Sequence, residues 1–251
     1  MRHLETAYDD LEKRITVAGR KTDCTEDIGC ELDSERRSVI EACRSFKDSI
    51  SILRHDGFLY LHVSPLLPSM AEERKGEWWV QMIEERIAVN TKLVAAKTTL
   101  LSPEVFRLWT SAYGGCAAAR CARDMEDGLM DRDAHHLLNV MLAKPPASTG
   151  NLRLMSGFAG RRLTRAMDIL QRRGWLVAAS QDCSRRSSMI SFLWTTSDDW
   201  WGDSMPNQSR QDRTDAWRQF IHCLAVACKM RVPDAERLLS WLPVSDLVRV
   251  G

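Results

Sequence analysis

The sequence predicts a mainly α-helical (α+β) protein built around a winged helix-turn-helix, with a helical N-terminal region and a helical C-terminal extension. Three observations predict this fold. Residues 131–173 carry three helical patterns in a row, a glycine follows the third pattern, and two strand-like runs joined by a polar tip come next. The first and third patterns place apolar residues at i, i+3, i+4 and i+7, the spacing of one buried helix face.

The three helices of this core follow one another closely. The first is predicted over residues 131–143 and is followed by two prolines. Ser148 or Thr149 offers an N-cap for a short second helix at residues 151–155, because a hydroxyl there accepts a hydrogen bond from a free backbone N–H. The third helix is predicted over residues 161–173, where the apolar side chains again share one side.

A turn and a hairpin complete the core. Residues 156–160 (SGFAG) form the turn between the second and third helices. Gly174 ends the third helix, since glycine readily adopts the left-handed conformation of a helix end. Residues 175–179 and 189–195 are predicted strands, joined by a polar, basic tip at residues 181–188. This order is typical of a winged helix: two helices, then a basic third helix, then a basic hairpin.

Positive charge is concentrated in this core. Residues 151–190 contain eight arginines and two aspartates, a net charge of +6, whereas the whole chain carries +1. Arginine binds phosphates and guanine edges through a planar fork of donors. Arg161, Arg165 and Arg172 fall on the side of the third helix opposite its apolar residues, with Asp168 beside them. A solvated helix face is the alternative explanation, and nucleic-acid contact is favoured because arginines occupy both the helix and the hairpin tip.

The core is therefore predicted to bind double-stranded DNA. The third helix would enter the major groove, while the hairpin tip would contact the phosphate backbone or the minor groove. The residues expected to contact DNA are Arg153, Arg161, Arg162, Arg165, Arg172, Arg185 and Arg186.

Helical patterns also occupy the flanking regions. We predict a helical and mixed N-terminal domain at residues 1–130, the winged-helix domain at 131–201, and a helical extension at 202–251 that would be a second, truncated winged-helix-like unit. Ser102 and Pro103 are a favourable helix start, a cap followed by proline at N1. The predicted flanking helices cover residues 34–53, 71–89, 105–113, 117–125, 215–229 and 233–242, with strands at 57–63 and 246–250 and an ambiguous strand at 93–101.

Composition excludes several classes of protein. The chain is 44% hydrophobic and 27% charged, an ordinary globular balance. No apolar run approaches the roughly 20 residues of a membrane span, and residues 1–20 lack the apolar stretch of a secretory signal. We therefore expect a cytoplasmic protein with no membrane partner. No heptad pattern supplies a dimer interface, so the sequence selects no oligomeric state.

Eight cysteines are present, and we expect them to be reduced thiols in a cytoplasmic protein. None has the C-x-x-C spacing of a zinc site, although Cys24 and Cys30, in a polar segment, keep a redox or metal role as an alternative. The nucleotide-binding and hydrolytic motifs GxGxxG, GxxxxGK[ST], HExxH and GxSxG are absent. We expect no cofactor and no metal.

Several segments match a known module. They are the runs RRLTRA at 161–166 and LQRRGWLV at 170–177, the strand with Trp194, and the closing sequence DWW at 199–201. Residues 152–201 resemble the winged-helix module of the AlkZ-type family, and residues 92–107 and 216–242 are similar to its flanking segments. The family includes DNA glycosylases for alkylated bases and crosslinks together with AlkZ-related proteins that are not enzymes. The resemblance therefore implies DNA binding, with a role in transcription regulation or DNA repair.

The sequence departs from the glycosylases of that family. They position a water molecule with a glutamine-x-glutamine or glutamine-x-aspartate pair. No glutamine here is followed two places on by glutamine or aspartate; the glutamines are Gln81, Gln171, Gln181, Gln208, Gln211 and Gln219. Because base excision needs a polar group aimed at a flipped nucleotide, we expect binding without catalysis and keep an alkylated-base DNA glycosylase as a third hypothesis.

A protein–protein interaction module is the second hypothesis. Trp194, Trp200 and Trp201 lie in the acidic segment 194–201, which would contact a protein partner. The salt dependence of binding distinguishes DNA binding from protein binding. In DNA binding the logarithm of the affinity falls with the logarithm of the salt concentration, with a slope of about −0.9 per phosphate contact. An interface centred on tryptophan would barely respond to salt.

Overall fold

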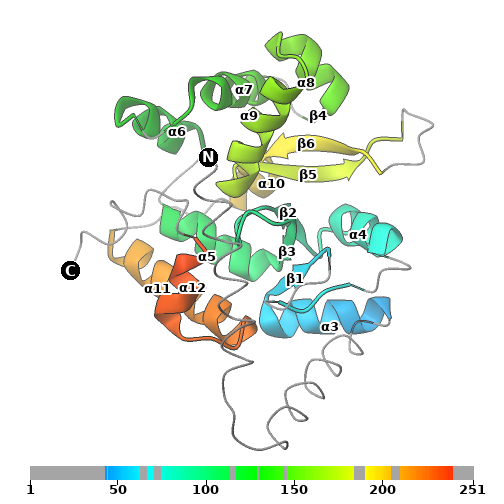
Figure 1. Ribbon diagram of the computed structural model, residues 1–251, viewed down its shortest axis with the longest axis vertical. Helices are drawn as coiled ribbons and strands as arrows, with labels where there is room; N and C mark the ends of the chain where they lie inside the picture. The colour runs from blue at the N-terminus through cyan, green and yellow to red at the C-terminus, as the bar shows by residue number, and fades with distance from the viewer. Residues whose placement is uncertain are drawn as a thin grey trace, which may run out of the picture.

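The computed structural model describes residues 43, 45–62, 67–70, 75–113, 117–128, 130–143, 146–183, 190–204 and 210–239. Helices surround two small antiparallel sheets (Figure 1), so the fold is mixed α and β, as the sequence predicts. The described helices are α3 (Phe46–Asp56), α4 (Lys75–Glu84), α5 (Pro103–Tyr113), α6 (Ala117–Glu126), α7 (Arg132–Ala143), α8 (Thr149–Ser156), α9 (Arg161–Arg172), α10 (Ser197–Trp201), α11 (Arg210–Ala227) and α12 (Val232–Arg237). The strands are β1 (Phe58–Tyr60), β2 (Val89–Thr91), β3 (Thr99–Leu101), β4 (Ala147–Ser148), β5 (Leu176–Gln181) and β6 (Phe192–Thr196).

The first sheet is built around β3. β1 and β2 pair with it on either side, so the strand order is β1-β3-β2, and every residue of these strands is buried. α3 leads into β1 through Gly57, whose φ of 79° is in the left-handed region. A Cβ at Gly57 would overlap the side chain of Val105, so the close approach of α5 requires glycine here.

The second sheet has the strand order β4-β6-β5. β6 is its central strand and pairs with β4 through Ala147 and Trp194, and with β5 through Leu176 and Thr196. α7, α8 and α9 lie together above this sheet in Figure 1. The chain order in this part is α7, β4, α8, α9, β5, β6.

One hydrophobic core connects the two sheets, and it includes residues from β1 through to α12. Trp109 of α5 is buried in it, with its ring centroid 5.3 Å from that of Phe220 on α11. A second contact joins α4 to the β5–β6 hairpin, where the ring centroids of Trp79 and Phe192 are 4.7 Å apart. The hairpin therefore packs against the preceding half of the chain.

The elements predicted for the core are confirmed. α7, α8 and α9 match the three predicted helices, and β5 and β6 match the two predicted strands. Ser148 is the N-cap of α8, where its side chain accepts a hydrogen bond from the backbone of Asn151. Gly174 has a φ of 68°. Ser102 also caps as predicted, because its Oγ accepts from the backbone N of Val105 at 3.3 Å.

Some predictions for the N-terminal region are wrong. α4 ends at Glu84, and Val89–Thr91 form a strand where the apolar pattern predicts a helix through residue 89. Within residues 93–101 only Thr99–Leu101 are extended, and the chain turns at Ala95 and Ala96, which have φ values of 49° and 56°. β1 ends at Tyr60, before the predicted end. Pairing with β3 decides these strands, and short apolar runs do not encode that pairing.

Element ends also differ in the flanking helices. α3 begins at Phe46 with Ser45 as its N-cap, later than the start predicted at residue 34. α11 begins at Arg210, earlier than predicted, and α12 ends at Arg237. The predicted strand at residues 246–250 lies outside the described residues, as do residues 1–42. Among the described helices, none has the length and apolar character that crossing a membrane requires.

Candidate nucleic-acid interface

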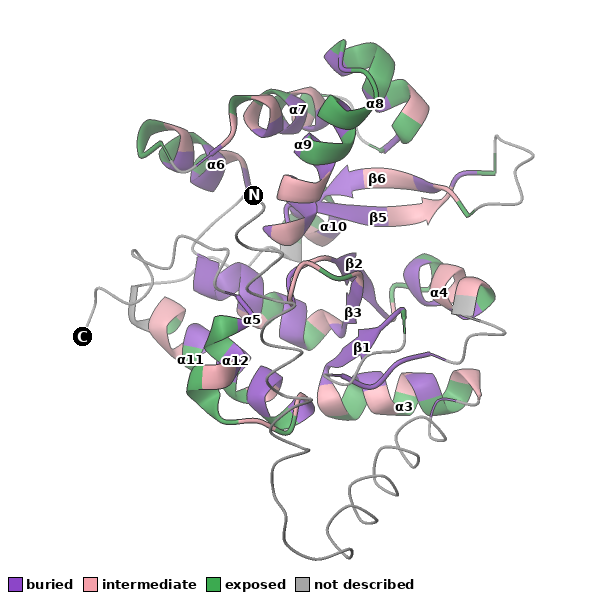
Figure 2. Ribbon diagram, viewed as in Figure 1, coloured by how far each residue is buried: buried purple, intermediate pink, exposed green. Residues whose placement is uncertain are grey.

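α9 has one buried face and one exposed face. Its buried residues are Leu163, Ala166, Met167, Leu170 and Gln171. Its exposed residues are Arg161, Arg162, Thr164 and Arg165, all in the first turns of the helix. Figure 2 shows exposed residues running over α8 and the start of α9, at one end of the molecule. The 3.6-residue helical period thus separates the basic side chains from the core, as predicted.

The turn before α9 presents its backbone to solvent. Gly157 (φ 68°) ends α8, and Gly160 (φ 49°) is the N-cap of α9 without a side-chain hydrogen bond. A Cβ added at either glycine would meet no atom within 4 Å, and Ala159 between them is exposed. The positive end of the α9 dipole is therefore open to an approaching anion.

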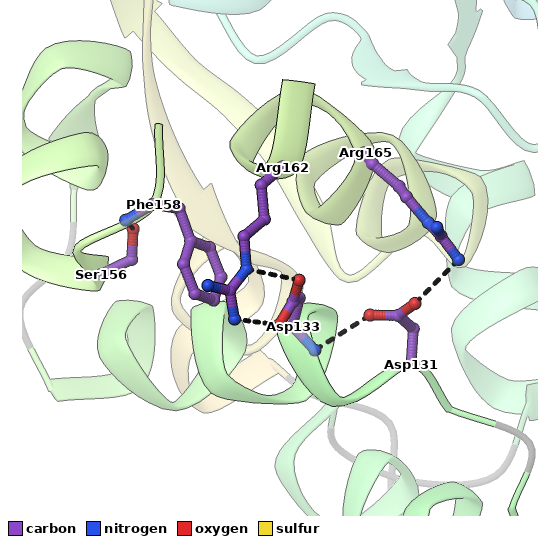
Figure 3. Close-up of polar contacts among 6 residues, drawn as sticks. All are labelled: Asp131, Asp133, Ser156, Phe158, Arg162 and Arg165. Atoms are coloured by element: carbon purple, nitrogen blue, oxygen red, sulfur yellow. Dashed lines mark hydrogen bonds and ion pairs between the residues drawn. The ribbon is translucent and has the colours of Figure 1, made fainter. Parts of the chain in front are cut away.

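Arg162 is held by two residues, Asp133 and Phe158 (Figure 3). Its Nε and Nη2 donate to the two carboxylate oxygens of Asp133 on α7, each at 2.6 Å. The face of its guanidinium lies 4.2 Å from the ring centroid of Phe158, a cation–π contact. The paired hydrogen bonds from Arg162 lower the pKa of the Asp133 carboxyl below its ordinary value.

Arg165, also on α9, has a looser partner in Asp131, the residue before α7. Its Nη2 donates to Oδ2 of Asp131 at 3.0 Å, a single contact (Figure 3). The other carboxylate oxygen of Asp131 accepts from the backbone N of Asp133 at 2.9 Å and so caps the start of α7. α7 and the residue just before it therefore supply carboxylates to two of the arginines on the exposed face of α9.

Arg153 and Arg161 are exposed without such partners. Among the described residues, no carboxylate forms an ion pair with either of them. Leu154, next to Arg153 on α8, is 81% exposed. Arg153, Arg161 and Arg165 are thus the site residues whose guanidinium groups are most available to a ligand.

Arg172 lies at the opposite end of α9 in a different setting. It is half-buried, and its Nη2 is 2.7 Å from Oδ2 of Asp168. The other oxygen of Asp168 accepts from Nζ of Lys92, 2.9 Å away, in the segment after β2. This cluster ties α9 to the first sheet, so the structure separates Arg172 from the exposed arginines with which the helical period groups it.

Arg173, one of the eight arginines in the basic stretch, is only 6% exposed. Its Nη1 pairs with Asp124 of α6 and donates to Oη of Tyr113 at 2.8 Å. Asp124 is completely buried and also pairs with Nε of Arg120 at 2.9 Å. Burial raises the pKa of Tyr113 to about 12, so its hydroxyl stays protonated at neutral pH.

This buried cluster fixes the end of α9 to α5 and α6, and sequence reasoning missed it. One signal could have found it. Arg173 follows Leu170 by three residues and Ala166 by seven, which places it on the apolar side of α9. The total of eight arginines therefore overstates the basic surface.

The hairpin tip is only partly described. β5 and β6 have one face against α4, and the backbone N of Gln181 donates to Glu84 of that helix at 3.3 Å. Arg185 and Arg186, predicted to contact the DNA backbone, lie outside the described residues. Their role remains a prediction.

The acidic, tryptophan-rich segment 194–201 is used inside the molecule. Trp200 is buried, with its ring edge-on to Phe106 at 5.8 Å. Trp201 stacks on the same phenylalanine at 5.7 Å, and its Nε1 donates to Oγ1 of Thr110. Asp198 accepts the first backbone N–H of α6 at 2.8 Å. Trp194 and Trp201 are half-buried, and a protein-binding role for this segment remains a prediction.

Two of the described cysteines, Cys43 and Cys121, are buried structural thiols, whereas Cys183 is exposed. Burial raises the pKa of Cys43 to about 11 and that of Cys121 to about 12, which leaves both protonated and unreactive at neutral pH. Cys24 and Cys30, the pair with a possible redox or metal role, lie outside the described residues. Within the part of the chain that is described, no group of three or more His, Cys, Asp or Glu could hold a metal ion.

Comparison with known proteins agrees with the resemblance found in the sequence. A family model described as AlkZ related matches residues 46–237, which include both sheets and all of α9. No curated protein and no solved structure matches the chain. Because the model covers most of the chain, the protein belongs to the AlkZ-related family.

Proposed function

We propose that this protein binds double-stranded DNA through a winged helix-turn-helix formed by residues 132–196. The proposal is supported by the chain order α7, β4, α8, α9, β5, β6 and the strand order β4-β6-β5, which agree with a winged helix. In such a fold α9 would be the recognition helix. The observation that carries the proposal is the exposed start of α9. Arg161, Arg162 and Arg165 gather there beside an open glycine turn, and all three are exposed.

The first turns of α9 would enter the major groove, since recognition helices contact bases through their N-terminal residues. Arg161 and Arg165 would contact phosphates or base edges, and Arg153 on α8 would contact the backbone. Arg185 and Arg186 would reach the backbone from the hairpin tip. Arg172 would contribute little, because Asp168 already neutralises it.

The family supports a role in DNA repair, and transcription regulation is the other role that such a module serves. No excision step is proposed, because the glutamine pair of the family's glycosylases is absent from the sequence. DNA binding without base removal is the function that the exposed arginines support best.

The proposal is tested by fluorescence anisotropy with a random DNA duplex between about 50 and 200 mM salt. The variant Arg161→Ala/Arg165→Ala is expected to bind roughly 10- to 100-fold more weakly, with a double-logarithmic salt slope shallower by about 2. Arg218→Ala/Arg237→Ala removes the same charge from α11 and α12, where these side chains are 69% and 68% exposed, and is the control. Equal loss in both variants, or no binding by the unaltered protein at low salt, would refute the proposed surface.

A further inference from the structure

The arginines at the start of α9 differ in how firmly they are already bound. Arg161 has no carboxylate partner among the described residues, Arg165 has one contact, and Arg162 has two contacts to one carboxylate as well as an aromatic ring. A phosphate must compete with these contacts, since carboxylate and phosphate oxygens accept the same hydrogen bonds from a guanidinium. The three arginines are therefore not equally available to DNA.

The pair between Arg162 and Asp133 is built as a fixed contact. Both donors of one guanidinium edge are used, at 2.6 Å each, and Phe158 covers the flat face. Phe158 in turn lies 5.3 Å from the ring of His136 on α7. This arrangement joins α7, the glycine turn and α9, so Arg162 and Asp133 are positioning residues for the exposed helix start.

The pair between Arg165 and Asp131 is built as an exchangeable contact. It has a single hydrogen bond of 3.0 Å, whereas the similarly exposed pair of Arg162 and Asp133 has two hydrogen bonds of 2.6 Å and a contact to Phe158. Asp131 keeps its second role when that bond breaks, because its other oxygen caps α7 through the backbone N of Asp133. Arg165 can therefore leave Asp131 without disturbing either helix.

We infer that Asp131 competes with DNA phosphate for Arg165 and thereby limits the DNA affinity of this surface. On binding, Arg165 passes from Asp131 to a phosphate, while Arg162 stays on Asp133 and holds α9 against α7. This inference rests on the proposed DNA-binding function. Asp131 then faces the DNA unpaired, and its negative charge opposes the complex.

Asp131→Asn tests the inference, because asparagine keeps the oxygen that caps α7 and removes the charge. The variant is expected to bind random duplex roughly tenfold more tightly at about 0.1 M salt, with a salt slope steeper by about 1. Asp234→Asn is the matched control. It makes the same charge change on α12, where the carboxylate of Asp234 pairs with Arg231 and Arg237. α12 lies apart from α7 and α9 in Figure 1.

A double-mutant cycle identifies the partner. In an Arg165→Ala background, Asp131→Asn should give a clearly smaller gain in affinity, because it then removes only the repulsion between Asp131 and DNA and releases no guanidinium. The inference would be overturned if Asp131→Asn raised the affinity equally in that background, or if Asp234→Asn raised it as much. Either result would indicate a general effect of charge on DNA binding. Unaltered affinity in Asp131→Asn would overturn the inference alone, whereas absence of DNA binding by every variant would overturn the proposed function with it.

Discussion

Replacement of Asp124 by asparagine is expected to destabilise the fold severely. Asp124 is completely buried and lies between Arg120 and Arg173, which are 7% and 6% exposed. The amide preserves the size of the side chain and removes the negative charge between two buried guanidinium groups. Breaking a buried ion pair in this way costs about 3–5 kcal/mol. At about 2–4 °C per kcal/mol for a chain of this size, Tm should fall by roughly 6–20 °C.

Thermal unfolding followed by circular dichroism, together with urea titration, measures this loss. Asp234→Asn is again the control, because Asp234 also joins two arginines, Arg231 and Arg237, but these are 82% and 68% exposed. Exposed pairs contribute about 1 kcal/mol or less each. If Asp124→Asn lowered stability no more than Asp234→Asn, Arg173 would not depend on a buried carboxylate and could face solvent. That result would refute its assignment to the core.

Two further predictions concern the ends of α9. Gly174→Ala should lower the free energy of unfolding by more than about 1 kcal/mol. The reason is that φ is 68° at this position and an added Cβ would lie 2.8 Å from Nε1 of Trp109. A Tm equal to that of the unaltered protein would contradict this prediction. Arg162 lowers the pKa of the Asp133 carboxyl in the folded state. The ion pair therefore contributes its full stability at pH values above the ordinary carboxyl pKa of 3.8, and this contribution is lost as the pH falls through the lowered pKa. The stability difference between the unaltered protein and Asp133→Asn should therefore be largest near neutral pH and shrink below about pH 4, and a difference that is constant with pH would count against the pair.

Local signals predicted the core elements well and the first sheet poorly. The cap at Ser148 and the glycine at 174 act within one helical turn, so the printed sequence contains all that determines them. β2 forms only because it pairs with β3. In that pairing Asn90 lies opposite Leu100, ten residues further along the chain. An apolar run such as Ile87–Val89 fits a helix or a strand equally well, and a tertiary contact selects between them.

The sequence by itself determined that α9 would have an apolar side and an arginine-rich side, because the period of a helix depends only on spacing. The tertiary structure decided which of those arginines a ligand can reach. Arg162, Arg165 and Arg173 find their carboxylates 29, 34 and 49 residues away. Ion pairs of that separation depend on how α6, α7 and α9 pack, since the strength of a charge pair follows distance and burial in space. The exposed residues Arg153 and Arg161 stand out as a candidate binding site only once those partners are known.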